Sequence, residues 1–135
     1  MLRKDAKIEL IRRVPLFARC SKRELGMVAL LADEIDMPEG RELTHQGRRG
    51  HEFMILVAGA ADVQRDGKVI NKLGPGDFVG EIALVTGRSR TATVATRTPS
   101  RVLVINAPAF RGLLARAPTI QSRVMDAVAE RRPAV

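Results

Sequence analysis

The chain has 135 residues, a formal net charge of +8, a single cysteine and neither tryptophan nor tyrosine. This length predicts one domain with a proper core, and aromatic content of only 3% leads us to expect a core of Leu, Val, Ile and Ala. The scarcity of aromatic rings argues against a stacking groove for single-stranded nucleic acid, and the lone Cys20 excludes an intramolecular disulfide. No stretch is long and apolar enough to span a bilayer, and the chain starts with a charged helix instead of a signal peptide. We therefore expect a cytoplasmic protein with no membrane partner.

The basic charge is concentrated at the N-terminal end. The first 23 residues hold eight Lys and Arg residues against Asp5 and Glu9. Such an end can attract nucleic acid, an acidic partner or an anionic membrane surface, although a solvated helix face is the commoner origin of this pattern. We do not expect nucleic-acid binding by this end on its own.

Two helices are predicted at the N-terminal end. Apolar residues among charges over residues 5–13 indicate a short amphipathic helix that Pro15 interrupts. Ser21 and Glu24 have the spacing of a capping box, which starts a second helix that ends near Ala32.

Between residues 33 and 106 the chain consists of short apolar runs separated by glycines, which is typical of strands. Residues 52–58 form the best candidate for a central strand, and Asp66-Gly67 is a strong hairpin signal. The number and spacing of the strands predict a closed or double-sheet β architecture. The predicted strands cover residues 34–37, 41–44, 52–58, 60–65, 68–73, 91–96 and 101–105.

Two further helices are predicted at the C-terminal end. Asn106 can cap the first of them, with Pro108 in its opening turn. Pro118 begins the second, in which Ile120, Val124 and Val128 form an apolar stripe.

The chemically most informative segment begins at Gly80, where a glycine followed by a short helical run offers close backbone approach and unpaired N–H groups to an anion. Arg90 presents a planar fork of donors suited to a phosphate, and the small residues Thr91 and Ala92 follow it. Glu81 is repelled by a phosphate, but it can accept hydrogen bonds from a neutral hydroxyl such as a ribose 2′-OH. Taken singly, Glu81 could complement a helix dipole and Arg90 could be a solvated cation. Their joint spacing with the glycine and the Thr-Ala pair favours a phosphate site.

These residues resemble the phosphate-binding cassette of the cyclic-nucleotide-binding domains, which occur in the catabolite activator protein, in regulatory subunits of cAMP-dependent kinase and in cyclic-nucleotide-gated channels. The family pattern reads approximately F-G-E-L/I-A/S-L, a short loop, then R-A/S/T-A-T/S-V. This chain has Phe78, then Gly80-Glu81-Ile82-Ala83-Leu84, and after a loop Arg90-Thr91-Ala92-Thr93-Val94. A lone Gly-Glu pair is weak evidence, whereas the whole register with a strand on each side is much stronger.

The resemblance implies a role for each matching residue. Arg90 clamps the cyclic phosphate, Glu81 accepts the ribose hydroxyl, and backbone N–H groups of Ile82, Ala83 and Ala92 complete the site. The candidate ligand-binding residues are Gly80, Glu81, Ile82, Ala83, Arg90, Thr91 and Ala92.

The resemblance also implies the fold: a mainly β protein with flanking helices, built on an eight-stranded β-roll of the double-stranded β-helix or jelly-roll kind. It covers the chain from about Val14 to about Arg132. We expect a single domain over residues 1–135, with N-terminal helices in 1–32, the roll in 33–106 with the cassette in 78–94, and C-terminal helices in 107–135.

Nothing in the sequence predicts an enzyme. There is no plausible Ser-His-Asp or Cys-His arrangement and no Walker lysine, and His45 and His51 with one cysteine make no convincing metal cluster. We expect no catalytic residue, no metal site and no cofactor other than cAMP or cGMP as ligand. The expected function is a small cytoplasmic cyclic-nucleotide receptor that signals to a protein effector or a homodimer partner by moving its terminal helices.

The lid, the base and the extent of the chain each allow alternatives. The last helix lacks the aromatic or long apolar lid that many members place over the base, and Val124, Met125, Val128 and Arg131 are the alternatives. Thr91 does not decide between cAMP and cGMP, and cAMP is our first choice because it is the commoner messenger among bacterial-looking relatives. No helix-turn-helix follows the last helix, so we expect a bare sensor or an excised one. The alternative function is a basic nucleic-acid-binding or scaffold protein with a vestigial nucleotide site.

Overall fold

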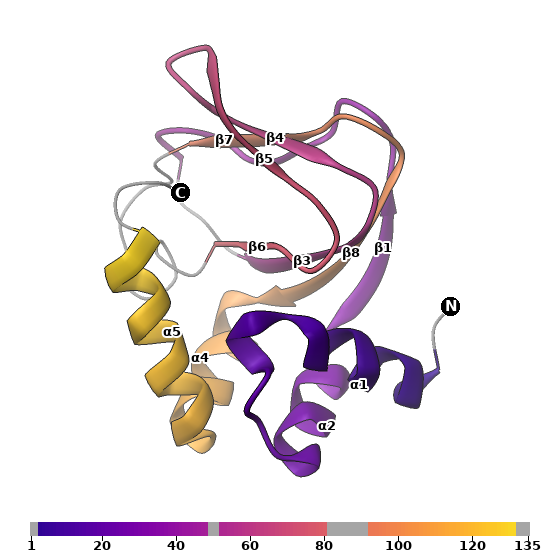
Figure 1. The fold of residues 1–135 in the computed structure, drawn as a ribbon, viewed down its shortest axis with the longest axis vertical. Helices are drawn as coiled ribbons and strands as arrows, with labels where there is room; N and C mark the ends of the chain where they lie inside the picture. Colours follow the sequence, from indigo (N-terminus) through magenta and orange to yellow (C-terminus); the bar gives the residue numbers. More distant parts are fainter. Residues whose placement is uncertain (1–2, 49–51, 81–91, 132–135) are drawn as a thin grey trace.

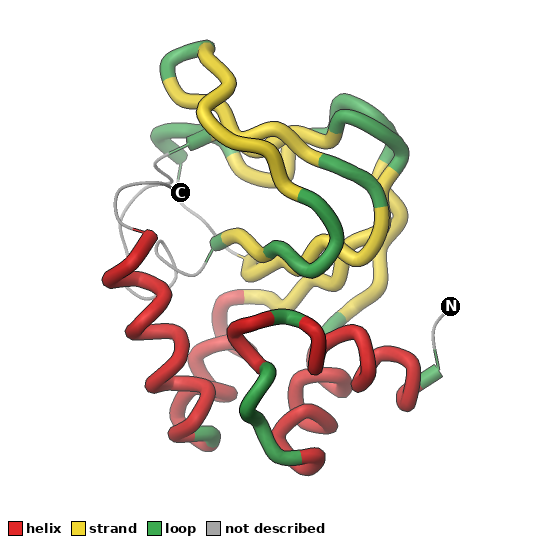
Figure 2. The backbone as a smooth tube through the Cα atoms, viewed as in Figure 1, coloured by secondary structure: helices red, strands yellow, loops and turns green. Residues whose placement is uncertain are grey.

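The structure, a computed structural model of the chain, describes residues 3–48, 52–80 and 92–131. Helices lie at both ends of the chain and the strands lie between them, as drawn in Figure 2. In chain order they are α1 (Lys4–Arg13), the 3-10 helix η1 (Pro15–Phe17), α2 (Lys22–Leu31), β1 (Asp33–Met37), β2 (Glu42–Thr44), β3 (Glu52–Ala58), β4 (Ala61–Arg65), β5 (Lys68–Leu73), β6 (Phe78–Val79), β7 (Thr93–Thr96), β8 (Ser100–Asn106), α4 (Ala107–Arg116) and α5 (Pro118–Arg131).

The eight strands form two antiparallel sheets of four. The first sheet has the order β1-β8-β3-β6 and the second the order β2-β7-β4-β5. Figure 1 shows three layers, with the second sheet on one side, the first sheet in the middle and all the helices on the other side. The predicted eight-stranded roll with helices at both ends is therefore confirmed.

Strand β3 shows why the first sheet occupies the middle layer. Its side chains alternate between two clusters: Phe53 and Ile55 pack with the helices, whereas Met54 and Leu56 pack between the two sheets. All four are buried. A strand that is covered on both faces must be apolar where it is covered, which explains the unbroken apolar run FMILVA after the exposed Glu52. Strand β8 repeats the arrangement, since Leu103 and Ile105 pack with the helices while Val102 and Val104 lie between the sheets.

The second sheet is covered on one face only. In β4 the buried Ala61 and Val63 alternate with the half-buried Asp62 and Gln64. This alternation is what a sheet with one solvated face requires. A cavity between the sheets, beside Met54, Leu56 and Val102, measures only about 10 Å³, so the described side chains pack closely there.

All four phenylalanines of the chain meet at the seam between the first sheet and the helices. The Phe53 ring stacks on Phe110 of α4 with ring centroids 4.6 Å apart, and it meets Phe17 edge to face at 6.1 Å. Phe78 of β6 lies 5.8 Å from Phe53. The expectation of a core built only from Leu, Val, Ile and Ala was therefore wrong, because the few rings are concentrated in one place where each adds its large apolar area.

The helix ends follow the predicted local signals. Ser21 and Glu24 form the capping box, and the Asn106 side chain accepts a hydrogen bond of 2.9 Å from the Ala109 N–H. Lys7 adds a contact that the sequence did not indicate, since its Nζ donates to the Ala32 carbonyl at 2.8 Å and ties α1 to the end of α2.

Two details of the strands differ from the prediction or extend it. The strand predicted at 91–96 begins at Thr93 in the described chain. Strands β1 and β2, which flank the Pro38–Gly40 turn, belong to different sheets, because β1 pairs with β8 and β2 pairs with β7. The hairpin at Asp66-Gly67 is confirmed, with φ values of +53° and +80°.

Gly59 lies at a close backbone contact between β3 and β8. Its φ is +99°, and a Cβ at this position would lie only 2.8 Å from the Ser100 Cα. Both the backbone conformation and the space therefore require glycine here.

We predict that Gly59→Ala lowers the free energy of unfolding by about 2–4 kcal/mol, because it adds strain and a clash with backbone atoms. Gly26 in α2 is the matched control, since nothing lies within 4 Å of a Cβ built on it. Gly26→Ala should stabilise the protein by about 0.5–1 kcal/mol through helix propensity. Urea unfolding followed by circular dichroism measures both, and equal effects of the two variants would contradict the prediction.

Candidate functional site

The predicted cassette begins where β6 ends. Gly80 is buried and has a φ of +106°, a conformation that side chains other than glycine rarely adopt. This is the position at which the motif requires a glycine. Residues 81–91 lie outside the described part of the chain, and with them Glu81, Ile82, Ala83, Arg90 and Thr91. The roles of these five residues stay predictions.

The segment that leads to Gly80 is fastened to β3. The Asp77 carboxylate accepts a hydrogen bond from the Gly74 N–H at 2.8 Å, which closes the predicted turn. The Asp77 carbonyl accepts from the Leu56 N–H at 2.8 Å, and the Leu56 carbonyl accepts from the Gly76 N–H at 2.8 Å. Strand β6 then pairs with β3 in antiparallel register. The position of Gly80 is thus set by the central strand of the first sheet.

The other end of the cassette is fastened to the second sheet. Ala92 is buried between the sheets, and β7 follows it. The Thr44 hydroxyl donates to the Ala92 carbonyl at 3.0 Å and accepts from the Val94 N–H at 3.1 Å. The Gln46 N–H donates to the Thr93 hydroxyl at 3.0 Å. Sequence reasoning missed Thr44 and Gln46, because both are about fifty residues away along the chain.

The two described ends of the cassette therefore belong to different sheets. Gly80 follows β6 of the first sheet, and Ala92 precedes β7 of the second. Both residues are buried. Residues 81–91 connect the two sheets, and the spacing of the sheets fixes where this connection starts and ends.

Helix α5 carries all four candidate lid residues. Ile120 and Val124 are fully buried in the cluster of the helices and the first sheet, and α5 contacts η1. Val124 is therefore occupied by core packing, whereas Met125 is 51% exposed. In Figure 1, α5 rises on the side of the molecule where β6 ends. The side chains of Val128 and Arg131 lie outside the description.

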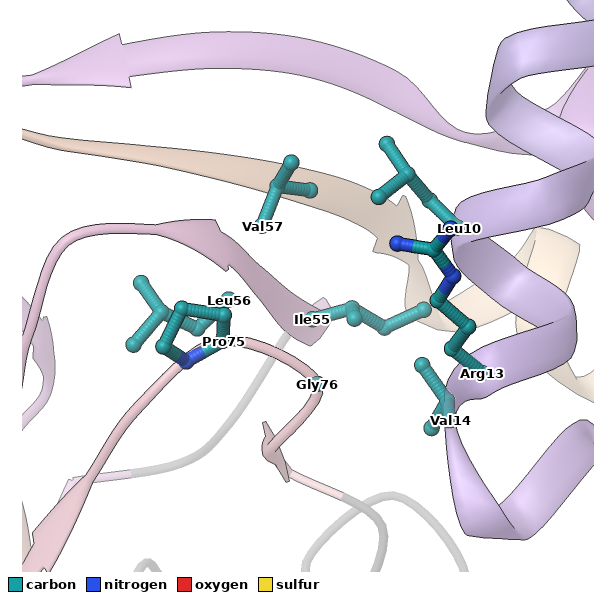
Figure 3. Close-up of a pocket in the computed structure, with 8 residues that line it drawn as sticks. All are labelled: Leu10, Arg13, Val14, Ile55, Leu56, Val57, Pro75 and Gly76. Atoms are coloured by element: carbon teal, nitrogen blue, oxygen red, sulfur yellow. The ribbon is translucent and has the colours of Figure 1, made fainter.

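A separate groove lies between α1 and β3, beside the 74–77 turn. It has a volume of about 280 Å³, and neither Gly80 nor Ala92 lines it. Figure 3 shows Leu10 and Arg13 projecting from α1 toward Ile55 and Val57 of β3. Its walls are mainly apolar, with one cation at the rim, and it offers no carboxylate for a ribose hydroxyl.

The basic end of the chain is displayed on the helices. Lys4, Arg13, Lys22 and Arg23 are all exposed. Arg12 is also exposed, and its Nε lies 3.7 Å from a Glu9 carboxylate oxygen. An exposed ion pair of this kind contributes little to stability.

Within the described residues no group of three or more His, Cys, Asp and Glu side chains could hold a metal ion. His45 instead lies 3.1 Å from the Glu42 carboxylate on the surface, and His51 is outside the description. Over the same described ranges, no helix is long and apolar enough to cross a membrane.

Cys20 is buried in the cluster of the helices and the first sheet. Burial, and secondarily the nearby Glu24 carboxylate, raise the pKa of its thiol to about 11, with Arg123 acting in the opposite direction. A thiol in this environment stays protonated near neutral pH and is a poor nucleophile.

The family model described as "Cyclic nucleotide-binding domain" matches residues 34–117. The chain is 36% identical to a cAMP-dependent protein kinase regulatory subunit of Mycosarcoma maydis over 75% of its length, and 30% identical to a cyclic nucleotide-gated potassium channel of Mesorhizobium japonicum over 93%. The chain belongs to the cyclic nucleotide-binding domain family.

The matched part is a fraction of each relative. It spans 21% of the kinase regulatory subunit and 35% of the channel. Among solved structures, the regulatory domain of Toxoplasma gondii PKA with cAMP superposes with a TM-score of 0.83 at 22% identity, over 95% of this chain and 50% of that one. This likeness shows the fold of the chain, which is the family's roll.

The environment of Cys20 predicts a defined pH dependence. Because the pKa of the thiol rises from 9.0 to about 11 on folding, the native state holds the proton more tightly than the unfolded chain. The contribution of this group to stability is complete below about pH 9 and is lost as the pH rises toward 11. We expect Cys20 to react slowly with Ellman's reagent at pH 8 in the native protein and rapidly in urea. Equal rates in the two conditions would contradict its burial.

Proposed function

We propose that this chain is a receptor domain for a cyclic nucleotide, with residues 78–94 as its phosphate-binding cassette. The observation that carries the proposal is the placement of the two described ends of the motif. Gly80 has the buried, positive-φ backbone that the motif requires, and Ala92 is buried at the start of β7. Membership of the family supplies the chemical context.

In this proposal each cassette residue has a distinct task. The Arg90 guanidinium pairs with the cyclic phosphate, and the Glu81 carboxylate accepts a hydrogen bond from the ribose 2′-OH. Backbone N–H groups of Ile82, Ala83 and Ala92 complete the phosphate contacts, Gly80 allows the backbone to approach the ligand, and Thr91 is the small residue that follows the arginine.

We propose cAMP as the first ligand, with cGMP as the alternative. Support comes from the relatives, since one is named a cAMP-dependent kinase regulatory subunit and one structural neighbour was solved with cAMP. The chain is proposed to act in the cytoplasm as a binding and not a catalytic domain. Support for a binding role comes from the match of residues 34–117 to the cyclic nucleotide-binding domain model.

The proposed output is a movement of the terminal helices against a protein effector or a second copy of the chain. Support comes from the packing of α5, which contacts η1 while Ile120 and Val124 join the cluster that contains Phe53 and Phe110. A change at α5 can therefore reach the N-terminal helices directly. Met125 is the described lid candidate that is free of core packing.

The phosphate contact can be tested by calorimetric titration with cAMP and cGMP. We expect Arg90→Ala to weaken binding by about 2–4 kcal/mol, because it removes a charged hydrogen-bonding partner of the phosphate. Arg90→Lys should recover only part of this loss, since a point charge does not replace the planar fork. Binding by the native protein that is unchanged in both variants would remove Arg90 from the site.

Arg111 provides the matched control, because it is an exposed arginine on α4. Arg111→Ala makes the same change in net charge and should leave the affinity unchanged. If both arginine variants lose affinity equally and the loss disappears at high salt, the binding is a general charge effect. That result would favour the nucleic-acid alternative, in which the basic end binds polyanions.

The helix movement has its own test. We expect saturating cyclic nucleotide to slow amide hydrogen exchange in α5, because the ligand base needs a cover and α5 rises on the side of the molecule where β6 ends (Figure 1). Helix α2 serves as the internal reference, and its exchange should change little. Unchanged exchange in α5, together with measured binding, would leave a receptor without this switch.

A further inference from the structure

A β-bulge interrupts the pairing of β2 with β7 beside the end of the cassette. Glu42 is opposite Ala95 and Thr44 is opposite Val94, so β2 advances two residues while β7 advances one. A bulge of this kind leaves ladder groups without their usual backbone partners and re-aims a side chain. The side chain that it re-aims here is that of Thr44.

The Thr44 hydroxyl takes the place of the missing backbone partners. It donates to the Ala92 carbonyl at 3.0 Å and accepts from the Val94 N–H at 3.1 Å. Thr44 is only 6% exposed, so water does not readily substitute for it. Removal of the hydroxyl would leave one buried acceptor and one buried donor unpaired.

These contacts determine where the Ala92 nitrogen lies. The Ala92 side chain is held between the sheets, with 1% of the residue exposed, and its carbonyl is held by Thr44. Two of the substituents on the Ala92 Cα are thereby fixed, and tetrahedral geometry then fixes the direction of the third, which is the nitrogen. This nitrogen carries the N–H assigned to the phosphate in the proposed function.

Gln46 adds further hydrogen bonds next to Thr44. The Gln46 N–H donates to the Thr93 hydroxyl, and the Gln46 side chain accepts from the Asp66 N–H and donates to the Asp66 carboxylate, both at 2.9 Å. Residues 44–46 therefore form hydrogen bonds both to β7 with its preceding residue and to the turn of the β4–β5 hairpin.

We propose that Thr44 is a positioning residue of the phosphate site, which holds the Ala92 nitrogen at the place from which its N–H reaches the cyclic phosphate. This inference rests on the proposed function and assigns to it a residue outside the cassette motif. Thr44 does not touch the ligand, and its effect on affinity passes through Ala92.

The test compares Thr44→Val, which keeps the shape and removes the hydroxyl, with Thr44→Ser, which keeps the hydroxyl. By calorimetry with cAMP and cGMP we expect the Kd to rise about tenfold in Thr44→Val and to stay within about threefold of native in Thr44→Ser. In the nucleotide-free protein, the Val94 amide should exchange faster in Thr44→Val, because its acceptor is lost.

Thr96 supplies a control of the same kind on β7, the strand that pairs with the strand of Thr44. It is 4% exposed, its hydroxyl donates to the Pro38 carbonyl at 2.6 Å, and it accepts from the Arg41 N–H at 2.9 Å. Thr96→Val should lower the unfolding midpoint as Thr44→Val does, yet leave the Kd within about twofold of native. The comparison separates positioning of Ala92 from general loss of stability.

The two phosphorothioate diastereomers of the bound nucleotide give a second readout. Sulfur replaces one exocyclic phosphate oxygen in each, so the ratio of their affinities reports which N–H groups contact which oxygen. Thr44→Val should change this ratio by about threefold or more, whereas Thr96→Val should not change it.

The outcomes are distinguishable. Absence of binding of either nucleotide by the native protein overturns the proposed function, and the inference with it. Native binding with the same Kd in Thr44→Val overturns the inference alone. An equal loss of affinity in Thr44→Val and Thr96→Val also overturns it, because the effect would then be one of stability.

Discussion

The burial of the first sheet on both faces is the constraint on which the rest of the structure depends. Strand β3 must satisfy the helices with Phe53 and Ile55 and the second sheet with Met54 and Leu56. Each such side chain contributes about 1.5–3 kcal/mol by leaving water. A one-residue slip of this strand would exchange the two sets, so its register is strongly specified. The positions of the helices and of the second sheet are therefore both set by packing against this strand.

This constraint also explains the rigidity of the proposed site's borders. Because the cassette starts from one sheet and ends on the other, the packing between the sheets sets the separation of Gly80 from Ala92. Val79, Ala92 and Val94 all belong to the cluster that fills this space. A loop whose two ends are fixed by packing loses less conformational entropy on ligand binding than a loop with free ends, which is the advantage of preorganisation.

The sequence predicted those features whose cause is local. The capping box at Ser21 and Glu24, the Asn106 cap and the Asp66-Gly67 hairpin each depend on residues within three positions of one another, and all are present. The family motif predicted the fold through a pattern that physical reasoning alone would not have assembled. The roles of Glu81, Ile82, Ala83, Arg90 and Thr91 are still predictions.

The features that the sequence did not reveal depend on distant contacts. The Thr44 bonds to Ala92 and Val94 span 48 and 50 residues, and a threonine in a short strand gives no sign of a special role. The convergence of four phenylalanines, between residues 17 and 110, is equally invisible to periodicity. In each case the topology of the two sheets creates the contact, and no local pattern encodes it.

The convergence of the phenylalanines has a spectroscopic consequence. With no tryptophan or tyrosine and only two histidines, the aromatic region of a proton NMR spectrum contains essentially these four rings. Phe17, Phe78 and Phe110 surround Phe53, and the four rings come from η1, β6, α4 and β3. The ring-current shifts that the phenylalanines produce therefore originate at a single place, the seam between roll and helices. The chain therefore carries its own spectroscopic label at the seam where the roll packs against its helices.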